Sequence, residues 1–127
     1  MDAVLALRPT DADALGGHPV LAAAAHTPDQ RIEGRRSTVQ LEDGGLPFSI
    51  NGVHATYWFD TGAELSVLTE SEAKRFGLRG TPGVCQVGDV NGTQVNMRIA
   101  VADELAVGSI RIRHAAFLVL PDDHPPL

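Results

Sequence analysis

Short runs of alternating or continuous apolar residues dominate the chain from residue 37 onward and predict β-strands. We expect strands at Ser37–Leu41, Leu46–Ile50 and Val53–Phe59, with Asn51-Gly52 as a two-residue hairpin turn between the last two. Both faces of the third run carry large apolar side chains, which is typical of a strand covered on both sides. This strand leads directly into an acidic turn, Asp60-Thr61-Gly62-Ala63.

The pattern changes from strand to helix shortly after that turn. Leu65–Leu68 is a short apolar run and predicts another strand. Thr69-Glu70-Ser71-Glu72 has the spacing of a capping box, which opens a helix that we expect to run to about Phe76. Gly77 follows as the C-terminal stop of that helix.

Two further hairpins complete the pattern. The expected strands are Cys85–Val90 with Thr93–Val101 around Asn91-Gly92, and Glu104–Val107 with Ile110–Leu120 around Gly108-Ser109. With only one short helix among these strands, the sequence predicts a mainly β fold.

Length and composition fit one domain with an N-terminal tail. The chain has 127 residues and is 43% hydrophobic, which is enough to bury a core. Residues 1–35 are rich in Ala, Asp, Gly, His and Pro, and we expect a tail or linker there. Residues 36–127 then form the folded domain.

Charge and motif content exclude several classes of function. A formal net charge of -6 argues against a nucleic-acid partner, because phosphate binding needs clustered cations and the adjacent basic residues are limited to the pairs Arg35-Arg36 and Lys74-Arg75. No apolar run is long enough to span a bilayer, so we expect a soluble protein, with a cytoplasmic or a periplasmic location left open. Motifs for metal ligation or phosphate binding are absent, and neither a metal nor an organic cofactor is expected.

The triplet Asp60-Thr61-Gly62 carries the candidate chemistry because it lies between two predicted strands. Aspartic peptidases use two carboxylates that share one proton, one as a general base toward water and the other as a general acid. That chemistry needs two such turns facing each other, and this chain has one. Either a second copy supplies the other carboxylate, or the site is not catalytic.

Several motifs together resemble the retropepsin-like aspartic protease family in its bacterial, single-domain form. They are the run Phe59-Asp60-Thr61-Gly62-Ala63, then Ser66, a short helix ending at Phe76-Gly77-Leu78, and a glycine-flanked hairpin near Gly88–Gly92. The resemblance covers about residues 37–121. It implies a closed or partly closed β-barrel of the acid-protease type, a homodimer, and a peptide or protein substrate.

The resemblance also implies roles for the residues of the turn. Asp60 is the catalytic carboxylate, Thr61 bonds across the dimer axis, and Gly62 offers its backbone amide to the carboxylate. Ala63 is small so that the partner turn can approach, and Ser66 resembles a hydroxyl residue that can bond the carboxylate. As alternatives, Thr61 is a β-branched residue at a strand end and Ser66 is an ordinary strand serine.

The predicted hairpin after the helix occupies the position of the family's flap, which folds over bound peptide. Its residues are Val87, Gly88, Asp89, Val90, Asn91, Gly92 and Thr93. Glycines at its tip suit a lid that must move. The alternative is a surface hairpin that covers nothing.

The chain departs from the family pattern after Leu120. Family members close the domain with an Ile-Leu-Gly-like triplet and a short helix, whereas here a proline-rich stretch leads to Leu127, and we expect that closing segment to be missing. Two hypotheses therefore compete: an aspartic endopeptidase acting as a homodimer, and a non-catalytic module of the same fold that binds peptide or dimerises. A third possibility is an unrelated small β-barrel in which Asp-Thr-Gly is a plain turn.

Overall fold

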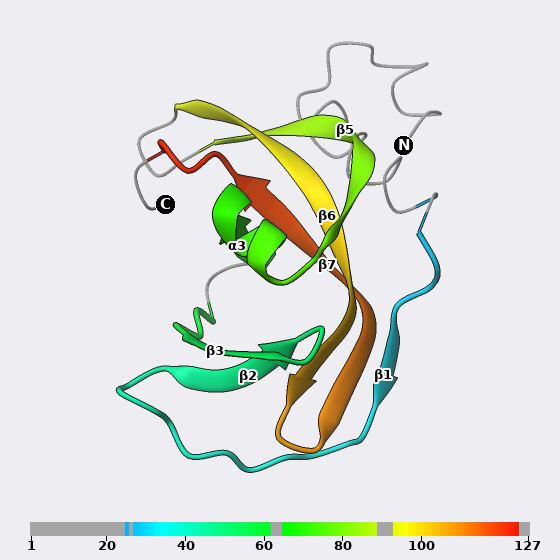
Figure 1. Ribbon diagram of the computed structural model, residues 1–127, viewed down its shortest axis with the longest axis vertical. Helices are drawn as coiled ribbons and strands as arrows, with labels where there is room; N and C mark the ends of the chain where they lie inside the picture. Colours follow the sequence, from blue (N-terminus) through cyan, green and yellow to red (C-terminus); the bar gives the residue numbers. More distant parts are fainter. Residues whose placement is uncertain (1–24, 26, 62–64, 89–92, 125–127) are drawn as a thin grey trace.

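A computed structural model describes residues 25, 27–61, 65–88 and 93–124 of the chain. Within these ranges it contains seven strands and one short helix (Figure 1). In chain order they are β1 (Arg31–Glu33), β2 (Leu46–Ile50), β3 (Val53–Tyr57), β4 (Val67–Thr69), α3 (Glu70–Arg75), β5 (Arg79–Gly88), β6 (Gln94–Val107) and β7 (Ile110–Leu120). The prediction of a mainly β fold with one short helix is confirmed.

The long hairpin of β6 and β7 is the centre of the sheet. The two strands are antiparallel, from Arg98↔Val119 to Val107↔Ile110, around the expected turn at Gly108-Ser109. Both run diagonally through the molecule in Figure 1 as its longest strands. Side chains of these two strands form much of the core. In β7, the residues from Phe117 to Leu120 are all buried.

Each of these two strands pairs with two shorter strands along its outer edge. One half of β6 pairs with β5 and the other half pairs with β2, which continues into β3 through the Asn51-Gly52 turn. In the same way, β7 pairs with β1 near Ile112 and, in parallel, with β4 from Leu118 onward. All other strands therefore depend on β6 and β7 for their position, directly or through β2.

The described strands form an open sheet and not a closed barrel. The strand order is β1-β7-β6-β2-β3, with β4 on β7 and β5 on β6, and within the described ranges no ladder joins β3 to β1. The barrel closure that the resemblance implied is therefore not present among the strands that the structure describes.

Several strands differ from those predicted. No strand forms at Ser37–Leu41; instead, Arg31–Glu33 pairs with β7 as an exposed edge strand, inside the segment expected to be a tail. The predicted break near Asp103 is absent, because β6 continues through it with Asp103 on the exposed side. Strand β5 begins at Arg79, well before Cys85, and its register shifts between Gly80 and Val84. The division of the chain at residue 35 remains a prediction.

Helix α3 is short and is fixed at both ends. The capping box is present, since the Thr69 side chain accepts from the Glu72 backbone N–H and the Glu72 carboxylate accepts from the Thr69 N–H at 2.8 Å. Gly77 follows the C-cap with φ at 64°, a left-handed conformation that suits glycine. Phe76, at the C-cap, is 1% exposed and packs with Ile50, Leu68 and Phe117 in the core.

Candidate active site

The candidate catalytic residue lies just beyond the end of β3. The strand stops at Tyr57, and Trp58, Phe59 and Asp60 continue without regular secondary structure, so the prediction of a strand to Phe59 is two residues too long. Asp60 and Thr61 are both exposed. Gly62 and Ala63 lie outside the described residues, so their predicted supporting roles stay predictions.

Both sides of the acidic turn are attached to the central hairpin. On the side before Asp60, β3 pairs with β2, whose Ile50 is paired with Leu105 of β6. On the side after it, the carbonyl of Ser66 accepts a hydrogen bond from the Leu118 N–H of β7 at 2.9 Å. Strand β4 then pairs in parallel with β7. The turn that carries Asp60 is thus positioned by β6 and β7 together.

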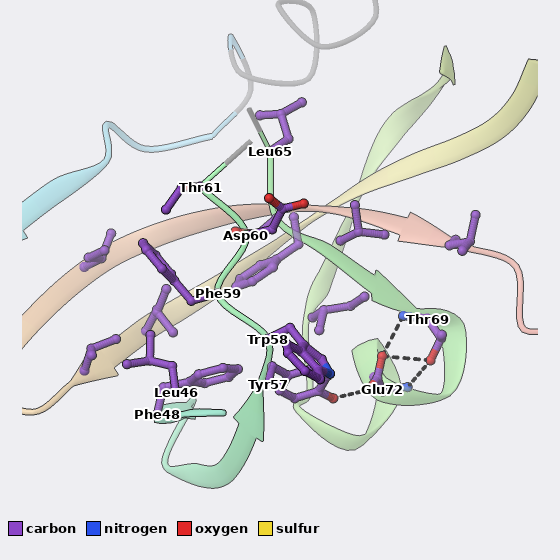
Figure 2. A pocket seen from close by; sticks show the side chains of 18 residues that line it. Leu46, Phe48, Tyr57, Trp58, Phe59, Asp60, Thr61, Leu65, Thr69 and Glu72 are labelled. Atoms are coloured by element: carbon purple, nitrogen blue, oxygen red, sulfur yellow. Dashed lines mark hydrogen bonds between the residues drawn. The ribbon is translucent and has the colours of Figure 1, made fainter. Parts of the chain in front are cut away.

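Asp60 lines a large hollow, shown in Figure 2. The cavity has a volume of about 880 Å³, which is within the range typical of small-molecule and peptide-side-chain sites. Three of the predicted site residues, Asp60, Thr61 and Ser66, line it together. Most of its remaining wall is apolar, including Leu46, Phe48, Phe59, Leu105, Ile112 and Leu120.

The turn is more open to solvent than the flanking apolar runs suggested. Apolar runs on both sides of a turn favour a recessed carboxylate, but the side chains beside Asp60 are themselves exposed: Phe59 is 72% exposed, Leu65 47% and Val67 36%. Within the described part of the chain, no second layer covers this edge of the cavity. An exposed group of large apolar side chains around a carboxylate is typical of a surface that contacts another molecule.

A second carboxylate, that of Glu72, also lines the cavity, but it is already bound on both oxygens. Oε1 accepts a hydrogen bond from the Tyr57 hydroxyl, and Oε2 accepts from the Thr69 N–H at 2.8 Å and from the Thr69 hydroxyl at 3.1 Å. Burial and the hydrogen bond to Glu72 raise the pKa of Tyr57. The capping-box motif predicted the contact with Thr69, but nothing in the sequence placed Glu72 in this cavity.

The predicted flap is described only in part. Strands β5 and β6 pair up to Val87↔Val95 and Gly88↔Gln94, which confirms that the two segments form a hairpin. Thr93 is exposed, and Asp89, Val90, Asn91 and Gly92 lie outside the described residues. Thr93, the only predicted flap residue whose side chain the structure describes, does not line the Asp60 cavity.

Other kinds of site were sought in the same ranges. Among the described residues, no three His, Cys, Asp or Glu side chains come close enough together to hold a metal ion. No helix there is long and apolar enough to cross a membrane.

Comparison with known families places most of the chain in one family. A family model described as aspartyl protease matches residues 46–127, from the start of β2 to the end of the chain, and this span includes Asp60 and the whole candidate site. Searches of curated proteins and of solved structures found no match to the chain. The family match covers well over half of the sequence, and the chain therefore belongs to an aspartyl protease family related to the retropepsin-like proteases.

Proposed function

We propose that the protein is an aspartic endopeptidase that acts as a homodimer, with Asp60 of each copy as the catalytic pair. The observation that carries this proposal is the place of Asp60 at the edge of a cavity of about 880 Å³, together with Thr61 and Ser66. Membership of an aspartyl protease family supports a hydrolytic role for that carboxylate.

The need for a second copy follows from the carboxylates that line the cavity. Among the described residues they are Asp60 and Glu72. Glu72 is engaged by Tyr57 and Thr69 on both oxygens, and its hydrogen bonds hold the start of α3. It is therefore not available as the partner of Asp60, and we propose that a second copy of the chain supplies the other acidic group.

Apolar side chains around Asp60 support the same assembly. Phe59, Leu65 and Val67 present exposed apolar surface beside the turn. A two-fold contact that brings two Asp60 residues together would bury this surface in both copies, which is favourable at about 25 cal/mol for each Å² removed from water. The same contact would place Thr61 near its symmetry mate.

The chemistry of such a pair accounts for every proton. One carboxylate removes a proton from a water molecule, whose oxygen attacks the peptide carbonyl carbon, while the protonated partner donates its proton toward the carbonyl oxygen. The carboxyl that took the water proton then passes it to the amide nitrogen, the C–N bond breaks, and the other carboxylate takes a hydroxyl proton from the collapsing diol, which restores the singly protonated pair. Two carboxylates held this closely do not both ionise, so the pair holds the single proton that this sequence needs.

In this proposal the hairpin from Val87 to Thr93 closes over an extended substrate. The described strands on either side of it stay paired up to Gly88↔Gln94, which supports a two-stranded arm. Closure over the cleft would bring the arm to a cavity that its described residues do not reach on their own.

The test is the Asp60→Asn variant, which keeps the shape of the side chain and removes its acid–base function. We expect loss of at least about a thousandfold in peptide cleavage, as is usual when an essential catalytic group is removed, with an unchanged circular dichroism spectrum. Asp123→Asn is the matched control, because Asp123 is exposed and does not line the cavity. Cleavage that persists in purified Asp60→Asn protein would contradict the proposal.

A second measurement separates the enzyme from a binding module. Digestion of a peptide library at several pH values is run with and without a transition-state analogue of aspartic proteases. Cleavage that the analogue inhibits supports the endopeptidase, whereas binding of the analogue without any turnover would favour the non-catalytic module.

A further inference from the structure

A smaller hollow adjoins the Asp60 cavity. It has a volume of about 300 Å³ and is lined by Glu42, Asp43, Gly45, Thr56, Tyr57 and Trp58. Tyr57 and Trp58 line both hollows, so the two share a wall. A peptide in the larger cavity can therefore extend a side chain into the smaller one.

A tight turn forms one side of this smaller hollow, and backbone hydrogen bonds hold its conformation without a ligand. Glu42 and Gly45 exchange backbone hydrogen bonds of 2.9 and 2.8 Å, and Asp43 and Gly44 between them have φ values of 48° and 81°. Such a two-residue turn with positive φ at both central positions is a rigid hairpin connection. Gly45 lies against β3, since a Cβ there would be 2.6 Å from a methyl carbon of Thr56.

Two carboxylates of this turn line the hollow: Glu42, which pairs with His54, and Asp43. Glu42 Oε2 accepts from the Thr56 hydroxyl at 3.0 Å and is 3.2 Å from His54 Nε2. These hydrogen bonds, with that to His54 the larger cause, lower the pKa of Glu42, so the group is ionised at neutral pH. Asp43 makes no ion pair or side-chain hydrogen bond with any described residue.

Arginines of the described sheet pair elsewhere. Those that form ion pairs do so with other carboxylates: Arg79 with Asp103, Arg98 with Glu70, Arg111 with Glu104, and Arg113 with Glu33 and Glu104. Among the described residues the ion-pair partner of Glu42 is His54, whereas the carboxylate of Asp43 has no ion-pair partner and can accept a cationic group from a ligand.

The wall of the hollow is aromatic, and it points to the same kind of ligand. Trp58 is 91% exposed, the most exposed of the large apolar side chains in the described ranges. An indole face attracts ammonium and guanidinium groups, by about 0.5–1 kcal/mol at an exposed site. Carboxylates alone would bind any small cation, whereas carboxylates beside an indole favour a cation on an apolar stem.

We propose that this hollow binds a basic side chain, lysine or arginine, of the peptide that occupies the Asp60 cavity. The presence of a peptide in the cavity depends on the proposed peptidase function. Recognition of the cation by the smaller hollow does not depend on it. It makes Glu42, Asp43 and Trp58 residues that determine specificity, and it predicts a preference for peptides with a basic residue beside the bound segment.

The experiment uses Trp58 as its own reporter, because it is the only tryptophan of the chain. The probe is N-acetyl-arginine methylamide, added to the full chain while Trp58 fluorescence is recorded. N-acetyl-citrulline methylamide, which has almost the same shape without the charge, is the control ligand. We expect a saturable change with the arginine probe and none with citrulline.

Substitutions in the Glu42–Gly45 turn then test whether its carboxylates cause the fluorescence change. Glu42→Gln and Asp43→Asn should each weaken binding of the arginine probe by roughly twofold to fivefold, the range expected for one exposed ion pair. Asp123→Asn should leave binding unchanged, and circular dichroism checks that each variant is folded. Equal responses to arginine and citrulline, or an arginine affinity that is unaffected in the Glu42 and Asp43 variants, would overturn the proposal.

The same titration on Asp60→Asn protein keeps this inference apart from the proposed function. If the variant still binds the arginine probe and the wild-type chain cleaves no peptide, the peptidase proposal is contradicted and the cation site is supported. If the wild-type chain cleaves arginine and citrulline peptides equally well and the probe does not bind, the cation site is contradicted and the peptidase proposal is supported.

Discussion

The side-chain amide of Asn51 donates a hydrogen bond to the carbonyl of Phe76 at 2.8 Å, and so joins the β2–β3 turn to the end of helix α3. Its Oδ1 accepts from the Glu104 N–H at 3.1 Å, while its own N–H donates to the Glu104 carbonyl at 2.9 Å. Asn51 holds φ at 49°, a left-handed conformation that asparagine tolerates better than most residues. One turn residue thus ties together a hairpin, a helix and strand β6.

Replacement of Asn51 separates its backbone role from its hydrogen bonds. Asn51→Gly keeps the left-handed conformation and loses both side-chain bonds, so we expect a loss of about 1–2 kcal/mol in unfolding free energy. Asn51→Ala adds the cost of the left-handed conformation, about 1 kcal/mol more. Urea unfolding measures both values, and equal stability of the two variants would contradict the backbone part of this prediction.

Tyr57 offers a direct test of the contact with Glu72, because it is the only tyrosine of the chain. Burial and the hydrogen bond to Glu72 raise its pKa above the usual value of 10.0. The tyrosinate absorbance should therefore appear only at a more alkaline pH, and at a lower pH in Glu72→Gln than in the wild type. A wild-type titration at the usual value would contradict the contact.

The raised pKa of Tyr57 also has a consequence for stability. A group whose pKa is raised in the folded state stabilises that state at all pH values below its unfolded pKa, and this contribution is lost as the pH rises above about 10. The contribution of the Tyr57 hydroxyl is thus fully present at neutral pH. A stability profile that rises between neutral pH and that alkaline range would argue against it.

Glu70 and Arg98 make an acid-sensitive link between α3 and β6. Arg98 donates two hydrogen bonds to the carboxylate, of 2.6 and 2.7 Å, and these lower the pKa of Glu70 from its usual value of 4.5. A carboxyl with a lowered pKa stabilises the fold above its unfolded pKa and loses that contribution as the pH falls through the folded value.

We therefore expect the thermal midpoint of the wild type to fall more steeply than that of Glu70→Gln between about pH 5 and pH 3. Calorimetry at a series of pH values gives both curves. Asp122, whose pKa is lowered by hydrogen bonds from Ser71, contributes in the same direction and is unchanged in the variant. Parallel curves would show that the Glu70 link adds nothing to stability.

Phe59 tests where two copies meet. If the apolar surface beside Asp60 is the contact surface, Phe59→Lys should weaken self-association at least about tenfold, because a charged group would have to be buried. Ile32→Lys is the matched control, since Ile32 is 66% exposed on β1, outside the Asp60 cavity. Sedimentation measures association for both, and equal effects of the two substitutions would place the contact elsewhere.

Elements set by local chemistry were predictable from the sequence. The hairpin at Asn51-Gly52 and the capping box between Thr69 and Glu72 depend on residues a few positions apart, and both are confirmed. Strand β1 was missed because Arg31–Glu33 is exposed on both faces and has no apolar pattern; it is held by pairing with β7 far away in sequence. The continuation of β6 through Asp103 is likewise a tertiary effect, since that strand is supported on both sides.

The candidate site was predictable in its centre but not in its walls. Asp60, Thr61 and Ser66 follow from one motif and do line a common cavity. Glu72 and Trp58 enter the two hollows through folding of distant segments, which no local pattern reveals. The turn at Asp43-Gly44 was not predicted, although Asp-Gly is a common sequence for a two-residue hairpin turn, and its place beside Trp58 is seen only in the structure.

The connectivity of the sheet also suggests an order of assembly. Strands β6 and β7 are joined by a two-residue turn, so their contacts are close in sequence and cost little chain entropy to form. Every other strand attaches to this pair, directly or through β2, and has no place to dock until the pair exists. The amides of β6 and β7 should accordingly be the last to exchange with deuterium, and the acidic turn should gain its geometry only in the final stage of folding.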